Sequence, residues 1–306
     1  MTAPGPVRGH NQDLRNGREH QVVIQGMAAA SGAGIANATR HDRYADISGR
    51  RIGVSAWNYP AQSGRLPIVL LHDSLGAIGL WRDFPAMLAA CTGHPVIAYD
   101  RLGFGNSDSH PSRLGHDFIR DEAHAFLLPL MDHLEVEQAI LFGHSVGGGM
   151  ALAAAAQLPG RIAAVITESA QAFVEDRTLE GIRAAKKNFA DPAQLARLAK
   201  YHGNDLEKAR WVLDAWTETW LAPEFAGWSL EEDLRKLRCP VLAMHGDLDE
   251  FGSGRHPEMI AGLPSAFAGQ GECVMFEGCG HVPHRENPAL VLETVMGFLN
   301  RHFPGK

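Results

Sequence analysis

Ser145 lies in a sequence pattern that could make it a nucleophile. Residues 143–147 read G-H-S-V-G, which has the form G-x-S-x-G; they follow a strand-like run at 139–142 and open a helix-like stretch rich in glycine and alanine at 146–157. A serine on a sharp strand-to-helix turn is held in a strained conformation with its hydroxyl above the sheet. The pattern therefore predicts that Ser145 attacks a substrate.

Two later segments could supply the base and the acid that such a serine needs. A serine hydroxyl is a poor nucleophile until a histidine takes its proton, and a carboxylate must orient that histidine. The strand-like run 241–244 leads into Asp247 and Asp249, and the run 273–276 leads into His281. Catalytic groups collect at the carboxyl ends of strands in open sheets. We predict His281 as the base and one of the two aspartates as the acid.

Other motifs carry weaker signals. His281 and His284 could share a metal, but no further ligands stand nearby at suitable spacing, so we expect no metal. Gly103-Phe104-Gly105 lacks the Lys-Ser/Thr of a phosphate-binding loop. The stretch from Val22 to Gly34 lacks the third glycine of a dinucleotide-binding turn. We therefore expect no cofactor.

Short apolar runs alternate with longer amphipathic stretches from about residue 44 onward. Each run is nearly continuous, which is typical of strands whose two faces are both covered. A hairpin is expected first, at 44–47 and 51–59. The alternation predicts an α/β fold with a doubly wound, mostly parallel sheet. The expected strands are 67–71, 96–99, 139–142, 162–167, 241–244 and 273–276, and the expected helices are 80–90, 118–134, 146–157 and 288–303.

One segment interrupts this alternation. Residues 171–230 contain no strand signal and three helix-like stretches, at 176–189, 192–201 and 206–221. They also hold four of the six tryptophans, most of which we assign to the core of an inserted helical cap. Trp216 and Trp220 are our candidates for contact with a substrate, because aromatic rings often line apolar pockets. The expected division is a flexible extension at 1–43, a core at 44–170 and 231–306, and a cap at 171–230.

These motifs together resemble those of the α/β-hydrolases, in particular capped, single-domain serine hydrolases, over about residues 44–303. The resemblance implies Ser145 as nucleophile, Asp249 as acid and His281 as base. It favours Asp249 over Asp247, with Glu168 a distant third. The matching segments are Leu70–Gly76 (LLHDSLG), Asp100–Ser107 (DRLGFGNS), Gly143–Gly147, Gly246–Asp249 and Gly280-His281-x-Pro283.

The resemblance also implies an oxyanion hole made by the backbone N–H groups of Ser74 and Val146. Two such donors stabilise the charge that develops during acyl transfer. The chain departs from the common His-Gly at this loop, since Asp73 follows His72. Asp73 either caps its own loop or biases substrate choice by repelling anionic acyl groups. His72 and His144 are interpreted as structural.

The activity implied is hydrolysis of a carboxylic ester or related acyl bond of a small, mostly apolar substrate. Dehalogenases and epoxide hydrolases of this fold use an aspartate nucleophile, so Ser145 argues against both. Carbon–carbon bond hydrolases, lactonases and cofactor-free perhydrolases share the serine triad and stay open. A hydrolase-like receptor for a small ligand is the alternative from outside enzymes.

Composition limits the remaining possibilities. The 306 residues carry a formal net charge of −7, which disfavours a nucleic-acid partner. Membrane spans and a secretory signal are not expected, because no apolar run is long enough. The four cysteines form no metal or disulfide framework, so we expect a cytoplasmic protein, with only Cys273 and Cys279 allowing a disulfide. Met27 is an alternative start, and oligomeric state cannot be read.

Overall fold

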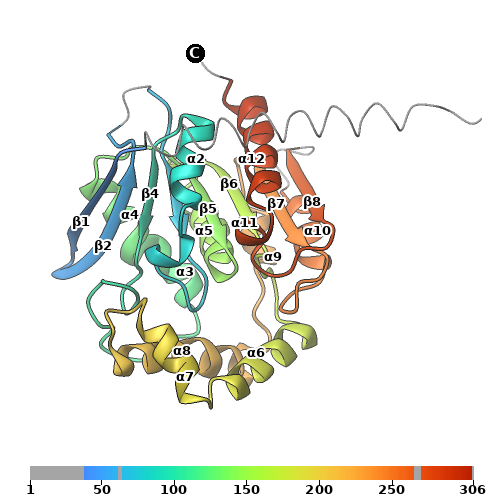
Figure 1. Ribbon diagram of the computed structural model, residues 1–306. Coiled ribbons are helices and arrows are strands. Elements are labelled where there is room, and N and C mark those ends of the chain that lie inside the picture. The colour runs from blue at the N-terminus through green and yellow to red at the C-terminus, as the bar shows by residue number, and fades with distance from the viewer. Residues whose placement is uncertain (1–37, 61–63, 265–269, 305–306) are drawn as a thin grey trace, which may run out of the picture.

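The computed structural model describes residues 38–60, 64–264 and 270–304, which form an eight-stranded sheet between two layers of helices (Figure 1). The strands are ordered β1-β2-β4-β3-β5-β6-β7-β8. β2 is antiparallel to both β1 and β4, and every other pairing is parallel. The bounds are β1 Arg40–Ile47, β2 Arg50–Trp57, β3 Ile68–Leu71, β4 Val96–Tyr99, β5 Ala139–His144, β6 Ile162–Glu168, β7 Val241–Gly246 and β8 Gly271–Phe276.

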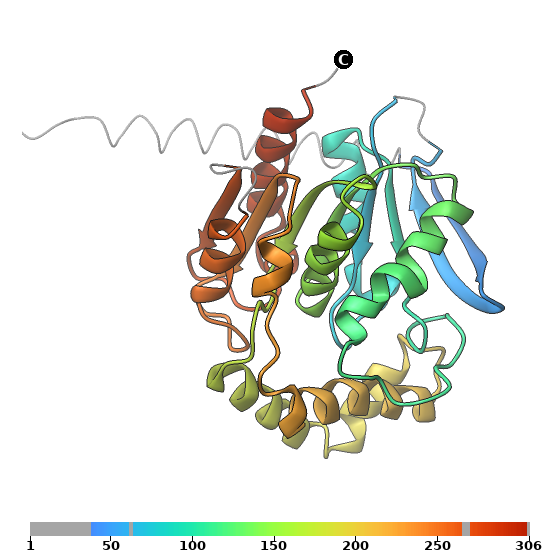
Figure 2. The same cartoon turned by 180° about the vertical axis from the view of Figure 1, so that it is seen from behind.

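Helices cover both faces of this sheet (Figures 1 and 2). On one face α2 (Phe84–Thr92) packs beside α12 (Pro288–His302), and on the other lie α3 (Phe118–Glu122), α4 (Leu128–His133) and α5 (Val146–Gln157). Because of this double cover, β3 and β5 are buried at every position, as their continuous apolar sequences require. The predicted doubly wound, mostly parallel sheet is confirmed.

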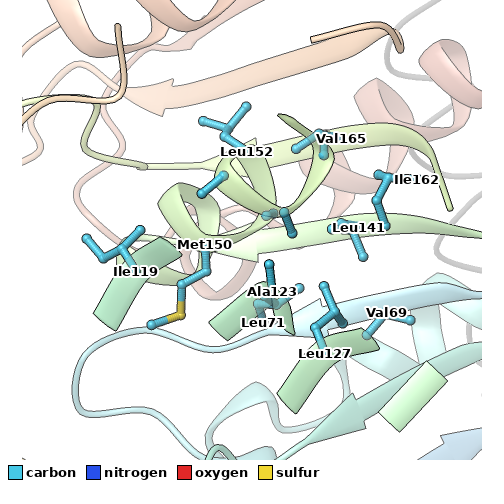
Figure 3. Close-up of a cluster of buried hydrophobic side chains, with 14 of the residues drawn as sticks. Val69, Leu71, Ile119, Ala123, Leu127, Leu141, Met150, Leu152, Ile162 and Val165 are labelled. Atoms are coloured by element: carbon cyan, nitrogen blue, oxygen red, sulfur yellow. The ribbon is translucent and has the colours of Figure 1, made fainter. Parts of the chain in front are cut away.

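The core under α5 fixes the position of the turn between β5 and α5. Small residues on α5 let the helix approach the strands closely, and larger aliphatic side chains from the sheet and α3 fill the space around it (Figure 3). The side chains labelled there are Val69, Leu71, Ile119, Ala123, Leu127, Leu141, Met150, Leu152, Ile162 and Val165. This packing holds the amino end of α5 rigidly against the carboxyl end of β5.

Gly147→Ala should therefore destabilise the protein strongly. A Cβ at Gly147 would overlap the backbone carbonyl oxygens of Leu71, the last residue of β3, and of His72, which follows it. Overpacking of this kind costs about 3 kcal/mol or more, because backbone cannot move aside as a flexible side chain can. Urea unfolding followed by circular dichroism would measure the loss.

Gly160→Ala is the matched control for that substitution. Gly160 is exposed, and a Cβ built there meets nothing within 4 Å. The control should leave the free energy of unfolding within about 0.5 kcal/mol of the wild type. Equal effects at the two positions would refute the close approach of α5 to β3.

The chain between β6 and β7 forms helices that lie across one end of the sheet (Figures 1 and 2). We call residues 171–230 the cap segment. Its helices occupy the three stretches expected to be helical, and a short α9 (Glu231–Leu234) leads back toward β7. They are α6 Asp176–Asn188, α7 Pro192–Ala199 and α8 Leu206–Trp220, and the 3₁₀ turn η3 Pro223–Phe225 follows them.

Two expected helices are interrupted. The stretch expected at 80–90 contains the end of a 3₁₀ turn, η1 (Ile78–Trp81), then Arg82 at φ 53°, and then α2, which has a proline in its first turn. The stretch at 118–134 is broken by a π-helical turn, η2 (Ala123–Leu127), between α3 and α4. Three short helices were not expected, namely α9, α10 (Arg255–Gly262) and α11 (Pro283–Glu286).

Most of the extension expected at 1–43 lies outside the described residues, including Met27 and the glycines at 32 and 34, while β1 begins at Arg40. Within the described ranges, no helix is both long and apolar enough to cross a membrane. Cys273 and Cys279 are free thiols.

Candidate active site

Ser145 occupies the turn between β5 and α5. Its backbone adopts φ 54° and ψ −125°, a strained conformation for a residue with a side chain, and 6% of its surface is exposed. The turn is held because the N–H of Ser145 donates to the carbonyl of Glu168 at 2.9 Å and its own carbonyl accepts from Gly148 at 2.9 Å. The hydroxyl consequently projects from a rigid support at the carboxyl end of the sheet.

Asp249 and His281 come together from the loops after β7 and β8. Nδ1 of His281 lies 2.9 Å from each carboxylate oxygen of Asp249, which is fully buried. Burial opposes ionisation of Asp249, but the hydrogen bond and charge of His281 outweigh it, so the pKa of Asp249 is lowered. In the neutral form of His281, a proton on Nδ1 that is donated to Asp249 would leave Nε2 unprotonated, which is the arrangement that a general base requires.

The other two acid candidates are engaged elsewhere. Asp247 accepts the backbone N–H of Gly278 at 2.7 Å. Glu168 is fully buried and accepts from Nδ1 of His284 at 2.6 Å as well as from that residue's backbone N–H. His281 and His284 thus face different carboxylates, and no cluster of three or more potential metal ligands occurs among the described residues.

A second histidine touches the buried acid. Nε2 of His245 lies 3.2 Å from Asp249 and 3.2 Å from the carbonyl of Gly252. Burial lowers the pKa of His245, which favours the neutral form that donates from Nε2. His245 was not singled out from the sequence, although it stands four residues before Asp249 at the end of the same strand.

A cavity of about 240 Å³ lies between the sheet edge and the cap segment. Ser145 and His281 line it from the core, and Trp216 and Trp220 line it from α8, as does most of the inner face of α6. Of the other cap tryptophans, Trp211 stacks on His110 and Trp228 packs on Phe225. The lining residues are Asp73, Ser74, Leu75, Ser145, Gln171, Thr178, Ile182, Ala185, Phe189, Trp216, Trp220, Phe251 and His281.

Gln171 is a further site residue that sequence reasoning missed. Its Oε1 accepts the hydroxyl proton of Ser145 at 3.3 Å, and its side chain is buried at the first position of the cap segment. Gln171 follows the carboxyl end of β6 by three residues, so its place at the catalytic edge of the sheet was the available signal. In the described conformation the hydroxyl of Ser145 is therefore hydrogen-bonded to Gln171.

The loop after β3 presents Ser74 to the cavity. Oδ1 of Asp73 accepts the N–H of Leu75 at 2.8 Å, and the carbonyl of Asp73 accepts the N–H of Gly76 at 3.1 Å. Within the described chain, the N–H groups of Ser74 and Val146 have no hydrogen-bond acceptor. Both are thus available to a substrate oxygen.

His72 and Arg101 stabilise the loop after β3 through hydrogen bonds. Nδ1 of His72 donates to the carbonyl of Asp73 at 2.8 Å, and its Nε2 accepts the N–H of Arg101 at 3.1 Å. The guanidinium of Arg101 donates to the same carbonyl at 2.8 Å. His72 has the structural role expected of it.

Asp73 fits both of the interpretations that the sequence left open. It caps its own loop through Leu75 and also lines the cavity. However, its second oxygen lies 3.3 Å from Nδ1 of His144, the buried residue before Ser145. Burial opposes the charges of both groups, but their pairing lowers the pKa of Asp73 and raises that of His144. The carboxylate faces the cavity with its charge already partnered.

The chain is similar in sequence to several known proteins. The family model described as the alpha/beta hydrolase fold matches residues 67–288. The acetyltransferase component of an acetoin-cleaving system from Pseudomonas putida is 29% identical over 277 residues, which are 84% of this chain and 69% of that protein. A 2-hydroxymuconate semialdehyde hydrolase from Pseudomonas sp. (strain CF600) is 27% identical over 76% of this chain and 86% of that protein.

Solved structures give a consistent picture of the fold. A 2-hydroxy-6-oxo-6-phenylhexa-2,4-dienoate hydrolase from Rhodococcus sp. strain RHA1 superposes with a TM-score of 0.70 over 86% of this chain and 99% of that one, at 19% identity. Some sequence matches are shorter: the chain spans 32% of the 1-acylglycerol-3-phosphate O-acyltransferases that it matches.

Proposed function

The chain belongs to the α/β-hydrolase family, and we propose that it is a serine hydrolase that cleaves a carboxylic ester or related acyl bond through Ser145, His281 and Asp249. One observation carries the proposal: the strained serine and a histidine held by a buried carboxylate line the same cavity. Nucleophile, base and orienting acid are the three groups that acyl transfer to serine needs.

In this mechanism the hydroxyl of Ser145 leaves Gln171 and turns to Nε2 of His281, which takes its proton as Oγ attacks the substrate carbonyl. Asp249 stabilises the imidazolium that forms. The N–H groups of Ser74 and Val146 donate to the oxyanion. His281 then protonates the leaving group, and a water molecule, deprotonated by the same histidine, releases the acyl group from Ser145.

The cavity favours a small, uncharged acyl group. Its volume of about 240 Å³ lies below the range of roughly 300–1,000 Å³ that is usual for drug-sized ligands. The cap side of the lining is mostly apolar, and the described lining includes no lysine or arginine. Asp73 adds a carboxylate whose charge is paired with His144. A carboxylate on the substrate would therefore have no lysine or arginine in the described lining to pair with.

The lack of lysine and arginine in the described lining also favours ester hydrolysis over carbon–carbon bond cleavage. The two hydrolases of this fold reported above are named for substrates with a carboxylate, a muconate semialdehyde and a dienoate. Burying an unpaired carboxylate costs several kcal/mol. We therefore propose neutral esters, including cyclic ones, as substrates in preference to carboxylate-bearing ring-fission products.

A matched pair of substrates tests both the reaction and the charge preference. The protein should react with a fluorophosphonate probe at Ser145 and hydrolyse short 4-nitrophenyl esters. The methyl ester of 4-nitrophenyl succinate should be turned over at least about tenfold better, in kcat/KM, than the free hemisuccinate, which differs by one charge. An absence of both labelling and turnover would instead favour a small-ligand receptor, and equal rates for the pair would refute the charge preference.

A further inference from the structure

His144 is a buried residue that the proposed reaction leaves without a role. It ends β5, directly before Ser145, and 2% of its surface is exposed. Its ring packs among the rings of Trp81, His281 and His284. A side chain at this position could simply pack under the turn and fill space. However, both ring nitrogens of His144 lie next to polar partners.

Each ring nitrogen of His144 faces a group that can only accept a hydrogen bond. Nδ1 lies 3.3 Å from the carboxylate of Asp73, and Nε2 lies 2.8 Å from the backbone carbonyl of His281. A neutral imidazole carries a single N–H and can satisfy one of these acceptors; an imidazolium carries two and satisfies both. The geometry thus calls for the cation.

We propose that His144, as an imidazolium, is a positioning residue that fastens the oxyanion loop to the loop carrying the catalytic base. This inference rests on the proposed function for its catalytic meaning. The bridge runs from Asp73, whose other oxygen holds the N–H of Leu75, through His144 to the backbone of His281. It links the loop that supplies the Ser74 donor to the residue that moves the proton.

The surrounding charges support a protonated ring. Asp73 and Glu168 are the anions that face His144. The other titratable groups around it are His281, His284, His72 and Arg285, of which the last three line the same small cavity as His144. His284 is bonded to Glu168, and His281 is bonded to Asp249. Burial opposes the charge on His144, but the hydrogen bond and charge of Asp73 outweigh it, so its pKa is raised above 6.5.

The bridge would support catalysis by fixing the positions of the two loops relative to each other. Acyl transfer requires the oxyanion donors and the base to meet one carbonyl group, and a misplacement of about 1 Å can cost about 100-fold in rate. Loss of the proton on His144 would release one of the two loops. Because the folded pKa is raised, this release is expected only as the pH rises above the ordinary histidine range, and it should lower kcat there.

Asp73→Asn is the sharpest test, because it keeps the shape and removes the charge. The amide oxygen can still accept from Leu75 while the NH₂ group points at Nδ1 of His144, which must then be unprotonated. We expect kcat for a neutral ester to fall about tenfold with KM within about twofold, because the charge-assisted contact between the two loops is replaced by a weaker neutral one while substrate binding is kept. Asp108→Asn is the control. The carboxylate of Asp108 also accepts hydrogen bonds from a backbone N–H and a basic side chain, both of Arg51, but it does not contact His144.

Histidine ¹⁵N NMR gives a readout that needs no activity. In the wild type at pH 7 the His144 signal, assigned by its loss in His144→Gln, should show both nitrogens protonated; in Asp73→Asn it should show one. The alkaline fall in kcat should be absent in His144→Gln, and thermal unfolding would show that the variants fold. A neutral His144 at pH 7, or an unchanged kcat in Asp73→Asn, would overturn the bridge. A protonated His144 in a protein without esterase activity would overturn the proposed function alone.

Discussion

Ser145→Ala is expected to lower kcat/KM for 4-nitrophenyl esters by at least about 10⁴-fold while the protein stays folded. The substitution removes the side-chain hydroxyl of Ser145, which lines the cavity from the strained turn. Without this hydroxyl the acyl-enzyme can no longer form. Removing the nucleophile of a serine triad costs up to about 10⁶-fold in kcat in a well-studied protease. Initial rates, with circular dichroism as a check on folding, would measure the loss.

Ser169→Ala is the matched control for that experiment. Ser169 is also a buried serine at the carboxyl edge of the sheet, directly after β6, and its hydroxyl has no hydrogen-bond partner in the described chain. Its loss should change kcat/KM by no more than about twofold and leave fluorophosphonate labelling intact. Substantial turnover by the Ser145 variant would show that another residue is the nucleophile.

His281→Ala should cost nearly as much as Ser145→Ala, and the double variant should be no worse than either. Residues that act as one unit are strongly non-additive, because a nucleophile without its base is already inactive. The two loops involved are far apart in sequence but share one cavity. Additive losses would place His281 outside the proton transfer.

The sequence predicted best those features that depend on short-range order. The strand-like run before Ser145 and the small residues after it define a tight turn, and the structure has Ser145 at φ 54° there. In the same way, the expected runs before Asp249 and His281 correspond to β7 and β8. Local pattern specifies where a strand ends, and in a parallel sheet all such ends lie on one edge.

The sequence predicted least well the contacts that depend on packing between distant segments. Gln171 reaches Ser145 across 26 residues, and His144 reaches the carbonyl of His281 across 137. No periodicity or motif encodes such pairs, because they depend on how the cap segment and the loop after β8 fold back onto the turn. The sequence marked Asp73 as unusual but could not show that its partner is His144, the residue before Ser145.

The tryptophans of the cap segment lie between these two cases. Four residues separate Trp216 from Trp220 on α8, so they share one face of the helix, and both line the cavity. That spacing could be read from the sequence. The direction of the face could not, because it depends on how α8 packs over the sheet edge, whereas Trp211 turns to His110 and Phe104.

Asp249→Asn is expected to lower kcat by about 10⁴-fold, the loss seen when the equivalent change forces the wrong histidine tautomer. Oδ1 of Asp249 accepts the N–H of Phe251 at 2.7 Å, and an amide oxygen can keep that bond. The amide NH₂ then faces Nδ1 of His281, which has to become the acceptor. The proton moves to Nε2, so the histidine cannot take a proton from Ser145.

Asp247→Asn distinguishes this tautomer effect from a general loss of charge near the base. The two aspartates share a loop, but Asp247 accepts only a backbone N–H, from Gly278, and an amide oxygen can replace it. We expect kcat within about threefold of the wild type, which corresponds to less than about 1 kcal/mol. Measuring kcat of both variants with the same ester at pH 7.5 would distinguish the tautomer effect from a general loss of charge. A larger loss at Asp247 than at Asp249 would mean that the histidine is oriented by a different carboxylate when substrate is bound, because the buried contact at 2.9 Å could not then be the catalytic one.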